Sequence, residues 1–304
     1  MGRWPPATRA WPTTIPRRSG PRWKNWPALA GPSPPSCVLR ICEAGPKSAH
    51  YALFCMPAPS AITFIGLHYW AGSGRAFEAV AHLLAPDYPL LSPDLLGFGD
   101  AALTEANSYT VDACADALAA FITGQKVRRY VLVGHSMGGK IALALAARQP
   151  TGLAGVALLS PSPPTPEPMT DEDRMLSVKA YGKPAEAEKT FRTITARPLA
   201  PKLHQQIVQD NLRSSRAAWD AWLLHGSREN ISGRMCDVQV PCMILAGDQD
   251  AIMSPSVHGL ETLPLLPEGT PLEIISGAGH LLPYEAPEEV AALLRRFAAR
   301  IETA

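Results

Sequence analysis

The chain has 304 residues, of which 46% are hydrophobic and 18% are charged, and its formal net charge at pH 7 is +1. This size suits one large α/β domain with an insertion, or two small domains. The balanced charge favours neither nucleic acid nor a membrane surface as a partner, and no apolar run approaches transmembrane length. The six cysteines show neither a Cys-x-x-Cys pair nor the spacing of metal ligands, so we expect no metal, no cofactor and reduced thiols in a cytoplasmic protein.

Residues 1–36 differ in composition from the rest of the chain. They contain nine prolines, four of the seven tryptophans and no acidic residue, without the periodicity of a helix or a strand. Because proline at this density blocks both helix and sheet, we predict a disordered extension rich in Pro, Arg and Trp. Two short apolar runs at 37–42 and 50–55 are compatible with a β-hairpin that leads into the main domain.

From residue 61 onward, apolar runs of strand length alternate with amphipathic segments of helix length. The pattern predicts buried strands over 61–67, 88–94, 130–133, 153–159, 241–246 and 272–275, and helices over 75–84, 110–122, 141–148 and from 287 to the C-terminus. This alternation predicts an α/β fold with a doubly wound, mostly parallel sheet. In such a fold, functional groups gather at the carboxyl ends of the strands.

Residues 161–232 interrupt the alternation. They begin rich in proline and continue as several predicted helices with no strand between them. We interpret them as a helical lid over a core built from 37–160 and 233–304. One lid helix places Trp219 and Trp222 on the same face, where they could line a substrate pocket or pack against neighbouring helices.

The segment 130–148 carries the most specific chemical motif. A buried strand is followed by a serine flanked by glycines at Gly134, Ser136 and Gly138, and then by a helix. A serine on such a strand–turn–helix corner is exposed above the sheet edge, and the helix N-terminus beside it favours a developing negative charge. The pattern therefore indicates a nucleophilic serine.

A nucleophilic serine needs a base, and an imidazole base needs a carboxylate that fixes its tautomer. His280 follows the last predicted strand, and Asp250 follows the strand before it, in the chain order Ser, Asp, His. Asp248 is an alternative acid only two residues away. Of the other histidines, His135 is expected to point away into the turn, and His68 to brace a loop.

These motifs together resemble the α/β-hydrolase superfamily, and most closely its small serine esterases with a lid. The matching stretches are Gly-His-Ser-Met-Gly-Gly at 134–139, Pro-Asp-Leu-Leu-Gly-Phe-Gly at 93–99, Gly-x-x-Asp at 247–250 and Gly-x-Gly-His-Leu at 277–281. The resemblance covers roughly residues 61–304. It implies Ser136 as nucleophile, Asp250 as acid, His280 as base, and the backbone N–H groups of Trp70 and Met137 as the oxyanion hole.

One position departs from the family pattern. Family members usually have His-Gly after the first core strand, where this chain has His68-Tyr69. Tyrosine cannot adopt the backbone angles of glycine as cheaply, so the loop can differ in shape. We expect the Tyr69 ring to border the acyl pocket; the alternative is that it turns outward and packs under the lid.

The predicted function is hydrolysis of a carboxylic ester on a small-molecule substrate, through an acyl-enzyme that water resolves. A C–C bond hydrolase or an acyltransferase on the same fold is the alternative, because the triad does not determine the electrophile or the acceptor. A third hypothesis is a ligand receptor that keeps the hydrolase pocket but catalyses no reaction. A serine nucleophile argues against the branches of the superfamily that use aspartate there.

Overall fold

The computed structural model describes residues 62–103 and 106–303 of the chain. The predicted extension over 1–36 and the predicted hairpin over 37–55 lie outside the described residues. No helix in the described part is long and apolar enough to cross a membrane.

The described residues form a six-stranded sheet in which every neighbouring pair of strands is parallel. Its spatial order is β2 (Leu90–Leu91), β1 (Thr63–Leu67), β3 (Tyr130–His135), β4 (Leu153–Leu159), β5 (Cys242–Gly247) and β6 (Leu272–Ile275). The prediction of an α/β fold with a parallel sheet is confirmed. β2 is shorter than the predicted strand over 88–94, because Pro89 and Pro93 flank it at the sheet edge and cannot donate hydrogen bonds to a neighbour.

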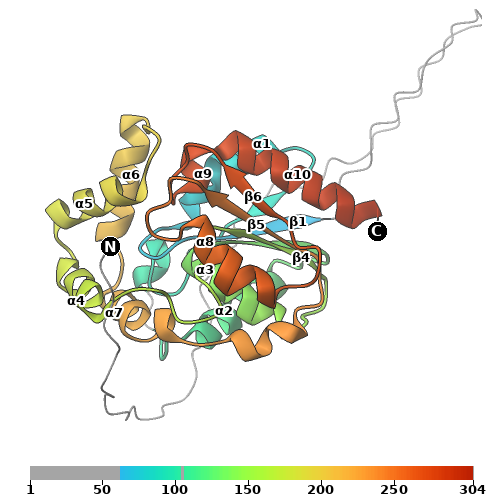
Figure 1. The fold of residues 1–304 in the computed structure, drawn as a ribbon, viewed down its shortest axis with the longest axis horizontal. Helices are drawn as coiled ribbons and strands as arrows, with labels where there is room; N and C mark the ends of the chain where they lie inside the picture. The colour runs from blue at the N-terminus through green and yellow to red at the C-terminus, as the bar shows by residue number, and fades with distance from the viewer. Residues whose placement is uncertain (1–61, 104–105, 304) are drawn as a thin grey trace, which may run out of the picture. The chain divides into compact units, whose positions relative to one another are not determined.

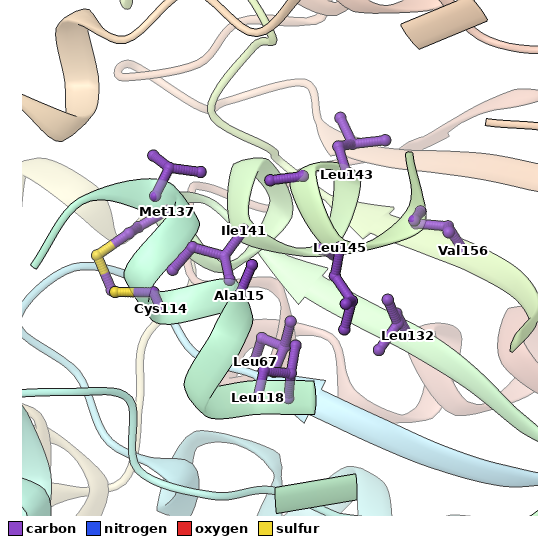
Figure 2. Close-up of a cluster of buried hydrophobic side chains, with 14 of the residues drawn as sticks. Leu67, Cys114, Ala115, Leu118, Leu132, Met137, Ile141, Leu143, Leu145 and Val156 are labelled. Atoms are coloured by element: carbon purple, nitrogen blue, oxygen red, sulfur yellow. The ribbon is translucent and has the colours of Figure 1, made fainter. Parts of the chain in front are cut away.

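Helices cover both faces of the sheet, as Figure 1 shows. On one face, α2 (Val111–Gly124) and α3 (Met137–Ala146) pack against one set of alternate strand residues, shown in Figure 2 with Leu67, Leu132 and Val156. On the other, α1 (Glu78–Leu84) and α10 (Pro287–Thr303) pack against the opposite set, which includes Phe64, Val133 and Leu245. Because side chains alternate along each strand, the two faces have separate apolar cores.

Four α-helices lie between β4 and β5, at one side of the sheet in Figure 1. They are α4 (Asp171–Ala180), α5 (Pro184–Ile194), α6 (Pro201–Leu212) and α7 (Arg216–Leu224). Their starts follow ordinary capping chemistry, since α5 and α6 begin with proline and the hydroxyls of Thr170 and Ser215 cap α4 and α7. Two short helices, α8 (Pro255–Val257) and α9 (Leu282–Glu285), follow β5 and β6.

The turn from β3 into α3 requires a close approach of the backbone. A Cβ atom placed on Gly134 would lie 2.6 Å from the carbonyl oxygen of Gly138 and 2.6 Å from the Cα of Gly139. α3 begins at Met137, before the predicted start at residue 141, although two glycines occupy its first turn. Packing against β1 and β3 therefore outweighs the weak helix propensity of glycine.

This close approach predicts opposite effects for two glycine substitutions. Gly134→Ala should lower the free energy of unfolding by about 1–3 kcal/mol, because the added methyl group meets backbone atoms that cannot move aside. Gly124 lies on α2, where an added Cβ meets no atom within 4 Å apart from its own helix backbone and chain neighbours. Gly124→Ala should therefore raise the free energy of unfolding by about 0.5–1 kcal/mol. Urea unfolding of both variants measures the difference. Equal stability of the two variants would contradict the packing account.

Candidate active site

Ser136 lies at the turn between β3 and α3, with φ 51° and ψ −117°, outside the regions that residues with a side chain ordinarily adopt. Three backbone hydrogen bonds hold it there. Its N–H donates to the carbonyl of Leu159 at 3.0 Å, and its carbonyl accepts from Gly139 at 2.8 Å and Ser162 at 2.9 Å. A Cβ on Gly138 would lie 2.3 Å from the carbonyl oxygen of Leu67, so the end of β1 lies directly against the start of α3.

His280 and Asp250 form a buried hydrogen-bonded pair. Nδ1 of His280 lies 2.8 Å from Oδ2 of Asp250, and both residues are 4% exposed. The other carboxylate oxygen, Oδ1, accepts the backbone N–H groups of Ile252 and Met253, each at 2.8 Å. Because the Asp250 carboxylate is held on both oxygens, the orientation of the imidazole is fixed as well.

The electrostatics favour an ionised Asp250 beside a basic imidazole. Burial alone would raise the pKa of the Asp250 carboxyl, but the charge and hydrogen bond of His280 and two backbone N–H groups lower it to about 2. For His280, burial lowers the pKa, but the charge and hydrogen bond of Asp250, with the charges of Glu167 and Glu285, outweigh it, so the pKa lies above the ordinary value of 6.5. An imidazole of this kind is a stronger base than one in water.

The competing acid, Asp248, has a different role. It lies at the surface, where its carboxylate accepts the Gly277 N–H at 2.7 Å and the Ser276 hydroxyl at 3.1 Å. It thereby ties the end of β5 to the loop after β6. The two aspartates are two residues apart, but only Asp250 points into the protein toward His280.

The sequence predicted that His135 points away into the turn, but in the structure its side chain points toward the His280 loop. Its Nε2 lies 2.7 Å from the carbonyl oxygen of His280, and the two rings are 5.3 Å apart. Since a carbonyl only accepts, Nε2 must carry the proton. Burial, with the nearby charge of His280, lowers the pKa of His135 to about 3. The residue before Ser136 is therefore a neutral bridge to the His280 loop.

The loop after β1 is braced from two sides. His68 is fully buried, with Nδ1 2.7 Å from the Tyr69 carbonyl and Nε2 accepting the Leu95 N–H at 2.9 Å, which agrees with the bracing role predicted for it. Farther along, the Ser73 hydroxyl donates to the carboxylate of Asp210 on α6 at 2.7 Å. Sequence analysis missed Asp210, because nothing local in a helical segment indicates a partner 137 residues away.

The aromatic residues predicted to line the pocket are buried. The Tyr69 ring lies 5.2 Å from the His135 ring, and the Trp70 ring lies 4.2 Å from that of Trp219. The Tyr69 hydroxyl and the Trp70 indole N–H are buried and have no hydrogen-bond partner among the described residues. Trp219 donates to the Ser177 carbonyl at 3.0 Å, whereas Trp222 packs into the core shared with α2 and α3. The insertion thus contacts the loop that carries Trp70.

Met137 is the first residue of α3, so its backbone N–H is not used within the helix. The predicted residues therefore follow the ends of four strands: Trp70 after β1, Ser136 and Met137 after β3, Asp250 after β5 and His280 after β6. In a parallel sheet these ends share one edge. Within residues 62–103 and 106–303, no group of three or more His, Cys, Asp or Glu side chains is placed to hold a metal ion.

Comparison with known proteins identifies the family. The model of the alpha/beta hydrolase family matches residues 64–293. Lipase LipV of Mycobacterium tuberculosis H37Rv is 30% identical over 243 residues, covering 75% of this chain and 90% of the lipase. The 2-succinyl-6-hydroxy-2,4-cyclohexadiene-1-carboxylate synthase of Serratia proteamaculans is 27% identical, covering 77% of this chain and 91% of the synthase.

Solved structures agree with this result. A thermophilic esterase from Thermogutta terrifontis superposes with a TM-score of 0.69 at 25% identity, covering 79% of this chain and 90% of the esterase. A bromoperoxidase from Bacillus anthracis has a TM-score of 0.72 at 18% identity, covering 78% of this chain and 92% of its own, and shows the shared fold. The predicted resemblance is confirmed: the chain is an enzyme that belongs to the alpha/beta hydrolase family.

Proposed function

We propose that the chain hydrolyses carboxylic esters of small molecules through an acyl-enzyme formed on Ser136. The observation that carries this proposal is the buried hydrogen bond between His280 and Asp250, joined through His135 to the turn that holds Ser136. The relatives named as lipases and esterases support an ester as the substrate.

In the proposed mechanism, Asp250 accepts a hydrogen bond from Nδ1–H of His280, which leaves Nε2 unprotonated to take the proton of the Ser136 hydroxyl. The serine oxygen attacks the ester carbonyl, and the N–H groups of Met137 and Trp70 stabilise the oxyanion. His280 returns the proton to the leaving alcohol. Water then attacks the acyl-enzyme, with His280 as the base. The bond between the acyl carbon and the Ser136 oxygen breaks, and His280 returns the proton to that oxygen, which releases the free acid.

A second candidate is a C–C bond hydrolase or an acyltransferase that uses the same three side chains. The relative from Serratia proteamaculans supports this second candidate, because that relative is named as a synthase rather than as a lipase or esterase. Product analysis distinguishes the candidates, since only ester hydrolysis releases a free acid and an alcohol in equal amounts from a simple ester in water.

Substitution of the nucleophile and the base tests the proposal. Ser136→Ala and His280→Ala should each reduce kcat for p-nitrophenyl acetate by roughly 10⁴- to 10⁶-fold, and the double variant should lose little more, because the side chains act as a unit. The measurement is steady-state hydrolysis, with circular dichroism as a control for folding. If Ser136→Ala kept a tenth of the wild-type kcat, the nucleophile would have to be another residue.

The two aspartates form a matched pair for the third role. Asp250→Asn should lower kcat by about 10³- to 10⁴-fold, because an amide in place of the carboxylate selects the wrong tautomer of His280. Asp248→Asn should lower kcat by less than about tenfold, since Asp248 contacts Gly277 and Ser276 rather than the imidazole. The reverse ranking in the same assay would assign the acid to Asp248.

We further propose that the insertion acts as a lid and that Tyr69 and Trp219 border the substrate pocket, whereas Trp222 packs into the core beside α2 and α3. The contact between Trp219 and Trp70 supports this role, because it places α7 beside the proposed oxyanion loop. Tyr69 supports it as well, since its ring lies next to His135, the neighbour of Ser136. The Tyr69 hydroxyl is buried and has no hydrogen-bond partner among the described residues.

Two substitutions of Tyr69 test the pocket role. Tyr69→Leu removes ring volume, so kcat/KM for p-nitrophenyl hexanoate relative to the acetate should rise several-fold, the size of effect that a few methylene groups produce. Tyr69→Phe keeps the ring and should leave this ratio near the wild-type value. An unchanged ratio in Tyr69→Leu would show that Tyr69 only packs.

A further inference from the structure

Glu285, the last residue of α9, is a buried acidic side chain that the proposed mechanism does not use. It is 6% exposed, and its carboxylate accepts four backbone N–H groups. Two belong to the residues on either side of His280, namely Gly279 and Leu281, each at 3.0 Å. The other two belong to Ala196 and Arg197, each at 2.8 Å, in the connection between α5 and α6 of the insertion.

Other contacts also join residues 194–197 of the insertion to the loop that carries His280. The N–H of His280 donates to the carbonyl of Ile194 at 3.0 Å, and the Arg197 guanidinium donates to the carbonyls of Glu285 at 2.9 Å and Ser276 at 2.8 Å. A Cβ on Gly279 would lie 2.8 Å from the N atom of Ala196 and 3.0 Å from Oε1 of Glu285. The insertion and the His280 loop therefore touch through their backbones, with no space for a side chain between them.

We propose that Glu285 is a positioning residue, which fixes the backbone on both sides of His280, joins residues 194–197 of the insertion to the support of the base and adds its negative charge to the surroundings of the imidazole. This inference rests on the proposed function, in which His280 is the base. Hydrogen bonds to a carboxylate are stronger than those between neutral groups, and both carboxylate oxygens are used here. Displacement of the base by about 1 Å lowers the rate on the order of 10²-fold, so rigid support of this loop should raise kcat.

Glu285 also contributes a negative charge to the surroundings of His280. The groups facing this imidazole are Asp250, Glu167 and Glu285, with the histidines His135 and His258. Burial lowers the pKa of His280, and the charges of Asp250, Glu167 and Glu285 raise it above 6.5. Removal of the Glu285 charge should therefore lower the pKa of His280 and move the acid limb of kcat/KM to lower pH. Loss of backbone support alone would leave that limb in place.

The test compares Glu285→Gln with Glu289→Gln in the full chain. Glu289 is the matched control, because it forms an ion pair with the same Arg197 at 2.9 Å but lies on the exposed side of α10. In Glu285→Gln the amide must turn an NH₂ group toward backbone donors, so at least one hydrogen bond is lost. We expect kcat for p-nitrophenyl acetate to fall by about 10- to 100-fold with little change in KM, and the acid limb to move to lower pH. Glu289→Gln should match the wild type in both measurements.

A second variant separates geometry from charge. Gly279→Ala disturbs the same contact but keeps the carboxylate, so kcat should fall while the acid limb stays at the wild-type pH. The inference is overturned if Glu285→Gln or Gly279→Ala keeps the wild-type kcat, if Glu285→Gln loses activity without a shift of the acid limb, or if Glu289→Gln reproduces the effect. Should Glu285→Gln fail to fold, Gly279→Ala still decides through its kcat.

An NMR titration of the His280 imidazole in the wild type and in Glu285→Gln requires no substrate. If the wild type hydrolyses no ester, the proposed function fails, and the titration still tests the link between Glu285 and His280. A lower pKa of His280 in the variant supports that link, and an unchanged pKa contradicts it.

Discussion

The hydrogen bond between Asp250 and His280 is the interaction on which the rest of the site depends. It joins the loop after β5 to the loop after β6, and a Cβ on Gly247 would lie 2.2 Å from the carbonyl oxygen of Ala278, so these loops lie in contact. The bond is buried, and the charge and hydrogen bond of His280, together with two backbone N–H donors, lower the pKa of Asp250 to about 2. A fixed carboxylate of this kind gives the imidazole one tautomer and one orientation.

Around this pair, the surrounding contacts bring separate parts of the chain to one edge of the sheet. His135 connects the turn at Ser136 to the carbonyl of His280, and Glu285 connects the insertion to the backbone beside His280. Asp210 connects α6 to the loop after β1 through Ser73. The insertion is thus attached at the loops that carry the proposed base and the proposed oxyanion donor.

Local sequence patterns predict the main features of the fold and the places of the candidate site residues along the chain. The strand–Gly-x-Ser-x-Gly–helix pattern located Ser136 because a tight backbone turn requires glycine at fixed positions, and the alternation of strands and helices predicted the parallel sheet that brings strand ends together. The contacts of His135, Asp210 and Glu285 were not predictable in this way. Each partner lies far away along the chain or binds through backbone atoms, so neither periodicity nor motif spacing indicates it. β2 is shorter than its apolar residues alone predict, because the flanking prolines cannot donate hydrogen bonds to a neighbouring strand.

Covalent labelling with a fluorophosphonate probe tests most directly whether His280 and Asp250 activate Ser136. Such a probe reacts with serine residues that a neighbouring base activates. We predict one adduct in the wild type, located by peptide mapping on Ser136, and labelling slowed by roughly 10³-fold or more in His280→Ala and Asp250→Asn. An adduct on another serine, or equal labelling rates in the wild type and His280→Ala, would contradict this prediction.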